Sequence, residues 1–279
     1  MNVLSIQSWV AYGHVGNAAA VFPLQRMGVE TWSVNTVQFS NHTGYGSWRG
    51  QVYSGEAVRD GIEERGVLRR CDGVLSGYMG DAGIGEAVLD AVGRVRRANP
   101  DAIYLCDPVI GDIDTGVYVR PGIPQFMRDH AVRAADIVTP NQFELEYLSG
   151  SVVATRADLV RAIAAIHALG PKLVLATSMR LDETPDGAMD VVLSDGTSLA
   201  RIRTPLLPLM VNGTGDAVAA LFLGSFLKQR SAPTAAIHAI SAIHGLLERT
   251  AEAGSREILL VAAQDEFVTP SRLFALEML

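Results

Sequence analysis

The stretch that decides the fold runs from residue 103 to residue 149. It opens with Ile103-Tyr104-Leu105-Cys106, an apolar run of strand length, and continues with a helix-length segment at 121–134. A second strand-like run, Asp136-Ile137-Val138, is followed by a second helix-length segment at 142–149. Strands that alternate with helices in this way favour a parallel sheet, because parallel neighbours are joined by helical crossovers. This stretch therefore predicts an α/β fold.

The same alternation continues on both sides of residues 103–149. Alanine and leucine recur at three- and four-residue spacing in the segments expected to be helical. Further strand-like runs lie at 3–6, 31–34, 74–76 and 173–175, and further helix-length segments lie at 16–27, 55–66, 84–98 and 156–169. We therefore expect a three-layer sandwich with a mostly parallel central sheet.

The C-terminal third has a second pattern. The runs 189–193 and 198–203 are separated by Ser194-Asp195-Gly196-Thr197, which predicts a hairpin. Two long helices are expected at about 214–228 and 234–251, before a last apolar run at 258–261. Since no repeat, linker or shift in composition marks a boundary, we expect one domain spanning residues 1–279.

Composition excludes several classes of protein. The chain has 279 residues, 48% of them hydrophobic, which is enough for a large core and unlike a disordered segment. Its net charge of −7 gives no electrostatic footprint for nucleic acid or for an anionic membrane. No signal peptide and no apolar run of about 18 residues is visible, so we expect a cytoplasmic protein.

Cysteine and lysine are both scarce. Cys71 and Cys106 lie in different segments and are expected to be reduced structural thiols. Only two lysines occur, Lys172 and Lys228, which limits any mechanism that needs an amine nucleophile.

The run Asn212-Gly213-Thr214-Gly215-Asp216 leads directly into an apolar helix. The first amides of a helix have no intrahelical partner, so such an end binds anions. A carboxylate at this place can take a proton from an attacking hydroxyl while the amides stabilise a transferring phosphate. The alternative is that Asp216 only caps the helix, which aspartate often does.

Two further polar clusters follow predicted strands, where ligands bind in parallel sheets. Asp107 closes the strand 103–106 and Asp112 follows it in a loop, so the pair can hold Mg²⁺ or simply form a turn. Asn141 and Glu144 follow the strand 136–138 with the spacing of a capping box. The same two residues can also lie near phosphates and a metal, and both interpretations can hold at once.

The N-terminal region carries polar groups that can hold a heteroaromatic ring. They lie at Gln7-Ser8, at Gly13-His14-Val15-Gly16-Asn17 and in the segment 38–45. His14 and His42 have no other candidate metal ligands at suitable spacing, so they are not expected to bind a metal.

Taken together, these runs resemble the pyridoxal kinases of the ribokinase superfamily over nearly the whole chain and in the same order. The matching runs lie at 4–8, 37–45, 75–78, 107–112, 139–144 and 213–216. The Gly-Thr-Gly-Asp run marks the superfamily broadly, whereas Val37-Gln38-Phe39-Ser40-Asn41-His42-Thr43 is specific to pyridoxal kinases and decides the substrate class. The resemblance implies a ribokinase-like fold.

The resemblance also implies roles for individual residues. Asp216 would deprotonate the 5′-hydroxymethyl group of pyridoxal, and the amides of Gly213, Thr214 and Gly215 would form the anion hole. The vitamer would contact Ser8, Val15, Val37, Thr43, Gly44 and Tyr78. ATP would lie against Asp107, Asp112, Thr139, Asn141, Glu144, Thr177, Ser178, Gly213 and Thr214, with Asp107 and Glu144 at the metal.

Several partners follow from the same resemblance: ATP with Mg²⁺, pyridoxal-type vitamers, a monovalent cation such as K⁺, and a second copy of the chain in a homodimer. Two residues depart from common patterns of the family. Trp9 stands where many relatives have histidine, and Thr177 stands where some bacterial relatives have lysine, although others have Thr-Ser there.

Three alternatives remain open at this point. A hydroxymethylpyrimidine kinase of the same superfamily would share residues 213–216 but should lack the run 37–43. A non-catalytic B6 carrier would have no need of Asp107, Glu144 and Asp216. A pyridoxal-phosphate-dependent enzyme would need Lys172 or Lys228 for a Schiff base, and Lys172 begins a strand far from the expected ligand end.

Overall fold

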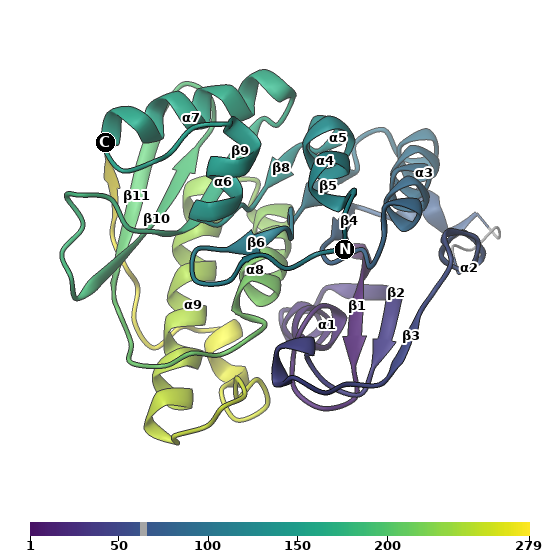
Figure 1. Ribbon diagram of the computed structural model, residues 1–279, viewed down its shortest axis with the longest axis horizontal. Coiled ribbons are helices and arrows are strands. Elements are labelled where there is room, and N and C mark those ends of the chain that lie inside the picture. The colour runs from purple at the N-terminus through teal and green to yellow at the C-terminus, as the bar shows by residue number, and fades with distance from the viewer. Residues whose placement is uncertain (62–65) are drawn as a thin grey trace.

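A central sheet runs through the molecule, between two layers of helices (Figure 1). The structure is a computed structural model that describes residues 1–61 and 66–279. Within these residues the sheet has ten strands in the order β12-β11-β10-β9-β8-β5-β4-β1-β2-β3. The predicted three-layer α/β architecture with a mostly parallel sheet is therefore confirmed.

The middle of the sheet is parallel and its edges are antiparallel. The parallel strands are β1 (Asn2–Val10), β2 (Glu30–Phe39), β4 (Gly73–Ser76), β5 (Ile103–Cys106), β8 (Ile137–Val138) and β9 (Leu173–Met179). The antiparallel edge strands are β10 (Ala188–Ser194), β11 (Leu199–Pro205) and β12 (Leu276–Met278) on one side and β3 (Gly50–Val52) on the other. A separate small hairpin consists of β6 (Gly111–Asp112) and β7 (Gly116–Val117).

Helices cover both faces of the sheet. One face is covered by α1 (Asn17–Arg26), α8 (Thr214–Gln229) and α9 (Ala232–Glu252). The other is covered by α2 (Gly55–Asp60), α3 (Ala82–Ala98), α4 (Ile123–Phe126), α5 (Val132–Ala134), α6 (Gln142–Ser149) and α7 (Arg156–Leu169). A π-helical turn, Met127–Ala131, joins α4 to α5.

The central strands are apolar throughout because they are buried on both faces. In β5, Tyr104 and Cys106 belong to the core under α3 and α6, whereas Leu105 belongs to the core under α8 and α9. Side chains of successive strand residues point to opposite faces, so an all-apolar strand serves two cores at once. Each fully buried leucine of this kind contributes about 1.5–3 kcal/mol to folding.

Most expected elements are confirmed, and the differences have local causes. The helices at 142–149 and 156–169 have the predicted bounds, and the hairpin of β10 and β11 is present. The helix expected at 55–66 was predicted too long, because it ends at Asp60 before Gly61, a poor helix former; residues 62–65 lie outside the described part. The strands β3, β6, β7 and β12 were missed because two or three residues show no periodicity.

Both cysteines are free and buried, as expected. Among the described helices, none combines the length and the apolar character needed to cross a bilayer.

Candidate active site

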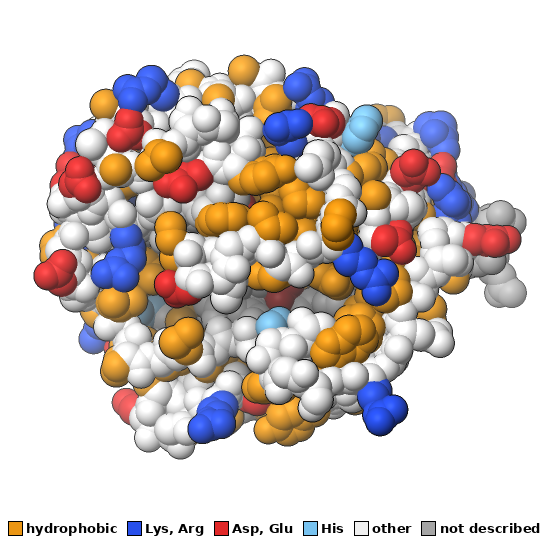
Figure 2. Space-filling model, viewed as in Figure 1, with side chains coloured by type: hydrophobic (Ala, Val, Ile, Leu, Met, Phe, Trp, Pro, Cys, Tyr) orange, Lys and Arg blue, Asp and Glu red, His pale blue; other side chains and the backbone are white. Residues whose placement is uncertain are grey.

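The residues predicted to bind the nucleotide gather at the carboxyl ends of β5, β8 and β9, next to the start of α8. Ligands of parallel sheets bind at this edge, because the strand ends and the helix N-termini converge there. Figure 2 shows a hollow in the surface. The hairpin of β6 and β7 and helix α6 lie above it, and the loops that follow β1 and β2 lie below it. An acidic side chain lies deep in the hollow, and a histidine lies at its lower margin.

Helix α8 begins at Thr214, and Gly213 is its N-cap. Asp216 therefore lies in the first turn of the helix, and the interpretation of Asp216 as an N-cap is wrong. The Asp216 carboxylate instead accepts a hydrogen bond from the backbone N–H of Gly16. Burial raises the pKa of Asp216 to about 6, and the Gly16 hydrogen bond limits this rise. At neutral pH the group is ionised but basic enough to accept a proton.

Gly213 cannot carry a side chain. Its φ of +85° is a left-handed conformation, and a Cβ there would collide with the carbonyl oxygen of His14. Gly215 faces open space, with nothing within 4 Å of an added Cβ. The loop is thus pressed against the His14 segment on one side and open on the side where an anion can approach.

This difference gives a stability prediction. Gly213→Ala should lower the free energy of unfolding by at least about 1–2 kcal/mol from the left-handed backbone alone, with a further loss from the contact with His14. Gly215→Ala is the matched control and should leave stability nearly unchanged. Urea unfolding of the two variants measures this, and equal midpoints would contradict the geometry.

Asp107 and Glu144 form a buried acidic pair. Asp107 is 6% exposed and accepts a hydrogen bond from the Thr139 hydroxyl at 3.0 Å. Glu144 is 4% exposed and accepts hydrogen bonds from the backbone N–H groups of Ile110 at 3.0 Å and Asn141 at 2.9 Å. The Asn141 side chain accepts in return from the Glu144 N–H at 2.9 Å, so the predicted capping box is confirmed.

Among residues 1–61 and 66–279, the acidic pair has no positively charged partner. Burial, and then the nearby charges of Glu144 and Asp216, hold the pKa of Asp107 well above its ordinary value. Burial raises the pKa of Glu144 to about 8, although backbone hydrogen bonds oppose the rise. In the part of the chain that the structure describes, no ion pair includes Asp107, Glu144 or Asp216. Clustered carboxylates without a cation fit a divalent metal.

The described residues contain no group of three or more His, Cys, Asp or Glu side chains arranged to hold a metal ion. Two carboxylates nevertheless suit Mg²⁺, which keeps several waters and takes its other ligands from nucleotide phosphates.

The remaining nucleotide candidates lie around this pair. The Asn141 side chain donates to the carbonyl oxygen of Gly111 at 2.8 Å and so ties α6 to the hairpin that carries Asp112. The backbone N–H of Thr177 donates to the Pro140 carbonyl oxygen at 2.8 Å. Ser178 is exposed and has a φ of 55°, a left-handed conformation that costs energy in a residue other than glycine.

The vitamer candidates fall into two places. Val15, Val37 and Tyr78 pack in one small apolar cluster with Val10 and Phe39. Ser8 is buried where the register between β1 and β2 shifts, and its hydroxyl leaves no space for a side chain at Gly16. Thr43 and Gly44 lie outside this cluster, in the exposed 3₁₀ turn Thr43–Tyr45. The structure therefore brings Val15, Val37 and Tyr78 together but leaves Thr43 and Gly44 at the surface.

Sequence reasoning missed Tyr118, which follows the hairpin of β6 and β7. Its backbone N–H donates to the carbonyl oxygen of Ile110 at 3.2 Å, and the residue is 52% exposed, yet nearby acidic side chains act on its hydroxyl. Burial and the charges of Glu144, Asp107, Asp216 and Asp112 raise the pKa of Tyr118 far above its ordinary value. No motif could have identified it, because only the folded hairpin brings it to the site.

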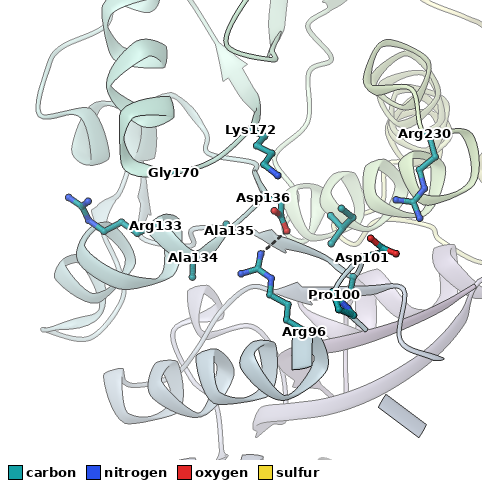
Figure 3. Close-up of a pocket in the computed structure, with 12 residues that line it drawn as sticks. Arg96, Pro100, Asp101, Arg133, Ala134, Ala135, Asp136, Gly170, Lys172 and Arg230 are labelled. Atoms are coloured by element: carbon teal, nitrogen blue, oxygen red, sulfur yellow. Dashed lines mark hydrogen bonds and ion pairs between the residues drawn. The ribbon is translucent and has the colours of Figure 1, made fainter. Parts of the chain in front are cut away.

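A second cavity, of about 670 Å³, lies at the opposite end of the sheet (Figure 3). Its cationic side chains surround the point where Arg96 donates to Asp136 at 2.7 Å. Three of these arginines lie at the C-terminal ends of helices, where a cation complements the negative end of the helix dipole. They are Arg96 in α3, Arg133 in α5 and Arg230 after α8. Lys172 lines this cavity, which confirms that it lies far from Asp216. The helix ends therefore explain the cationic lining of this cavity.

The chain is similar to proteins of known family. A model of the phosphomethylpyrimidine kinase family matches residues 32–260. Pyridoxal kinase PdxY of Granulibacter bethesdensis is 57% identical over 98% of this chain and 98% of its own, and pyridoxal kinase PdxY of Deinococcus radiodurans is 55% identical over 99% and 96%.

Solved structures give the same result. Pyridoxal kinase from Leishmania donovani in complex with ADP and pyridoxamine superposes with a TM-score of 0.91 at 30% identity, covering 100% of this chain and 99% of that one. The same protein in complex with ADP and pyridoxine gives a TM-score of 0.91 at 31% identity.

Proposed function

This chain belongs to the pyridoxal kinase family, and from that membership we propose that it transfers the γ-phosphoryl group of ATP to the 5′-hydroxymethyl oxygen of pyridoxal. The product is pyridoxal 5′-phosphate, which places the enzyme in vitamin B6 salvage. We propose that pyridoxine and pyridoxamine are also substrates, since solved relatives are complexes with these vitamers.

The observation that carries this proposal is the meeting of three carboxylates at the start of α8. Asp216 lies in the first turn of α8, and the charges of Glu144 and Asp216 both act on Asp107. A phosphate placed between them would lie on the free amides of Gly213, Thr214 and Gly215. This arrangement suits phosphoryl transfer, in which the protein mainly positions groups and neutralises charge.

In the proposed mechanism Asp216 accepts the proton of the attacking hydroxyl. Its pKa of about 6 still leaves it ionised at neutral pH, and the rise makes it a stronger proton acceptor than an ordinary aspartate. The Gly16 N–H holds the carboxylate in place. The first amides of α8 then stabilise the transferring phosphoryl group, because they point out of the helix without partners.

Asp107 and Glu144 would hold Mg²⁺, which supplies positive charge to the phosphates when it is bound. Asp112, Thr139, Asn141, Thr177 and Ser178 would line the nucleotide side of the hollow. Ser8, Val15, Val37 and Tyr78 would contact the vitamer ring, with Thr43 and Gly44 closing over it.

Three further predictions accompany the proposal. We propose that the chain is one kinase domain, that it forms a homodimer and that K⁺ or a similar cation raises its activity. Light scattering tests the dimer, and replacing K⁺ by tetramethylammonium in the assay tests the cation.

Two of the three alternatives, a hydroxymethylpyrimidine kinase and a B6 carrier, are less well supported than a pyridoxal kinase. The family model is described as phosphomethylpyrimidine kinase, yet the full-length relatives at 57% and 55% identity are pyridoxal kinases. A carrier of B6 would gain nothing from three buried or partly buried carboxylates, since they cost stability without a metal.

An assay of ADP release with Mg-ATP separates these functions. We expect turnover with pyridoxal and at most slow turnover with hydroxymethylpyrimidine at the same concentration. Preference for hydroxymethylpyrimidine would overturn the substrate assignment, and binding of pyridoxal without any ADP release would favour the carrier.

A further inference from the structure

Glu257 lies in the segment that follows α9 and is not among the site residues named so far. Its carboxylate joins the loop that follows β1 to the loop that follows β2. One carboxylate oxygen accepts from the backbone N–H of His14 at 3.2 Å. The other accepts from the hydroxyl of Tyr45. In Figure 1 the segment after α9 lies beside the loops that follow β1 and β2, which are far from it in sequence.

The segment that carries Glu257 is itself well held. The Ser255 hydroxyl donates to the Glu257 carbonyl oxygen at 2.7 Å and accepts from the Glu257 N–H at 3.1 Å. The next residue, Ile258, is fully buried, and its side chain packs against Gly213. Glu257 is therefore a fixed point from which two loops can be held.

The first of these loops reaches the reacting groups. Gly13 lies against the Glu257 carboxylate, the His14 carbonyl oxygen lies against Gly213, and the Gly16 N–H donates to Asp216. Residues 13–16 therefore connect Glu257 to both the anion hole and the base. A shift of this loop would move the hydrogen bond that holds Asp216.

The second loop carries Thr43 and Gly44. Its turn is exposed, and most of its hydrogen bonds stay within the loop, as from Asn41 to the Ser47 carbonyl oxygen at 2.9 Å. Among the described residues, the turn Thr43–Tyr45 makes one hydrogen bond to another part of the chain, from the Tyr45 hydroxyl to Glu257. The Tyr12 ring also lies near the turn, with its centroid 6.4 Å from that of the Tyr45 ring. A bond to a carboxylate is stronger than a neutral one, so it can order an exposed turn.

We propose that Glu257 is a positioning residue for the vitamer: its carboxylate fastens the Thr43 turn to the loop that holds Asp216. This inference rests on the proposed function. Tyr45 and Glu257 would raise the affinity for the vitamer without touching the reacting atoms. Nucleotide binding, which lies beyond β5, β8 and β9, should not depend on the bond between them.

Tyr45→Phe tests the link most cleanly, because it removes one hydroxyl and keeps the ring. We expect the KM for pyridoxal to rise about tenfold, as for loss of one hydrogen bond to a charged group, while the KM for ATP and kcat change less than about twofold. Glu257→Ala should raise the KM for pyridoxal at least as much and also lower kcat, because the His14 loop loses its support. Tyr12→Phe and Glu252→Ala are the matched controls and should behave as wild type.

Direct titration of pyridoxal without nucleotide should give the same order of affinities. The double variant Tyr45→Phe/Glu257→Ala should bind pyridoxal no more weakly than Glu257→Ala alone, because the two residues form one interaction. A Tyr45→Phe enzyme with unchanged pyridoxal affinity, strictly additive effects, or equal rises in both KM values would overturn the inference. Wild-type protein that fails to phosphorylate pyridoxal would instead overturn the proposed function.

Discussion

Asp216→Asn is expected to lower kcat by about 10²–10⁴-fold, the usual contribution of a general base. The amide has the shape of the carboxylate and can still accept a hydrogen bond from Gly16, so the start of α8 should keep its geometry. What the variant loses is the negatively charged, basic oxygen that we propose takes the proton from the vitamer hydroxyl. Folding and the dissociation constants of pyridoxal and ATP should therefore stay close to wild type.

The pH dependence provides the check on this role. Because burial raises the pKa of Asp216 to about 6, wild-type kcat/KM should fall as the pH drops through 6 and the carboxylate becomes protonated. The residual activity of Asp216→Asn should lack that acidic limb. Glu252→Gln, which changes an exposed carboxylate at the end of α9, serves as control. Near wild-type turnover in purified Asp216→Asn would rule out Asp216 as the base.

Asp107→Asn should weaken activity and strengthen the fold at the same time. The asparagine can still accept from the Thr139 hydroxyl, so no hydrogen bond is lost. The negative charge that suits Mg²⁺ is lost, and the Mg²⁺ concentration for half-maximal activity should rise by at least about tenfold. Steady-state rates at saturating pyridoxal and ATP, measured against free Mg²⁺, give this value.

The gain in stability should depend on pH. The folded-state pKa of Asp107 lies well above its ordinary value, so the folded protein keeps a proton that the unfolded chain releases. The stability that this proton contributes is complete below pH about 4, the ordinary range of aspartate, and declines as the pH rises toward the folded-state pKa. The unfolding free energy of Asp107→Asn, compared with wild type, should therefore increase from pH 5 to pH 8.

Urea unfolding without metal at several pH values measures this difference. Asp101 is exposed at the opposite end of the sheet, so the unfolding free energy of Asp101→Asn should change with pH as that of wild type does. If the unfolding free energy of Asp107→Asn followed the wild-type pH dependence as well, ionising Asp107 in the folded protein would not be unfavourable, contrary to its raised pKa.

Local sequence was sufficient for the features that depend on near neighbours. The apolar run 103–106 predicted a strand with two buried faces, and the spacing of Asn141 and Glu144 predicted a capping box. The Gly-Thr-Gly-Asp run predicted a helix start with open amides. Each of these rests on interactions within a few residues, which composition and spacing describe well.

Short elements and distant partners were beyond such reasoning. A hairpin of two-residue strands has no periodicity, so β6 and β7 and the position of Tyr118 could not be foreseen. The role of Glu257 depends on a contact between the end of the chain and loops near its beginning. Nothing in the composition around Glu257 distinguishes it from an ordinary surface glutamate.

Sequence by itself determined the parallel sheet, the capped helices and the presence of a carboxylate in the first turn of α8. Only the tertiary structure decided that Asp107, Glu144 and Asp216 share one buried space, and that Gly16 and not the helix end holds Asp216. The physical reason is that a pKa depends on burial and on charges brought close in space. Those charges come from separate strands and helices, and the fold alone sets the distances between them.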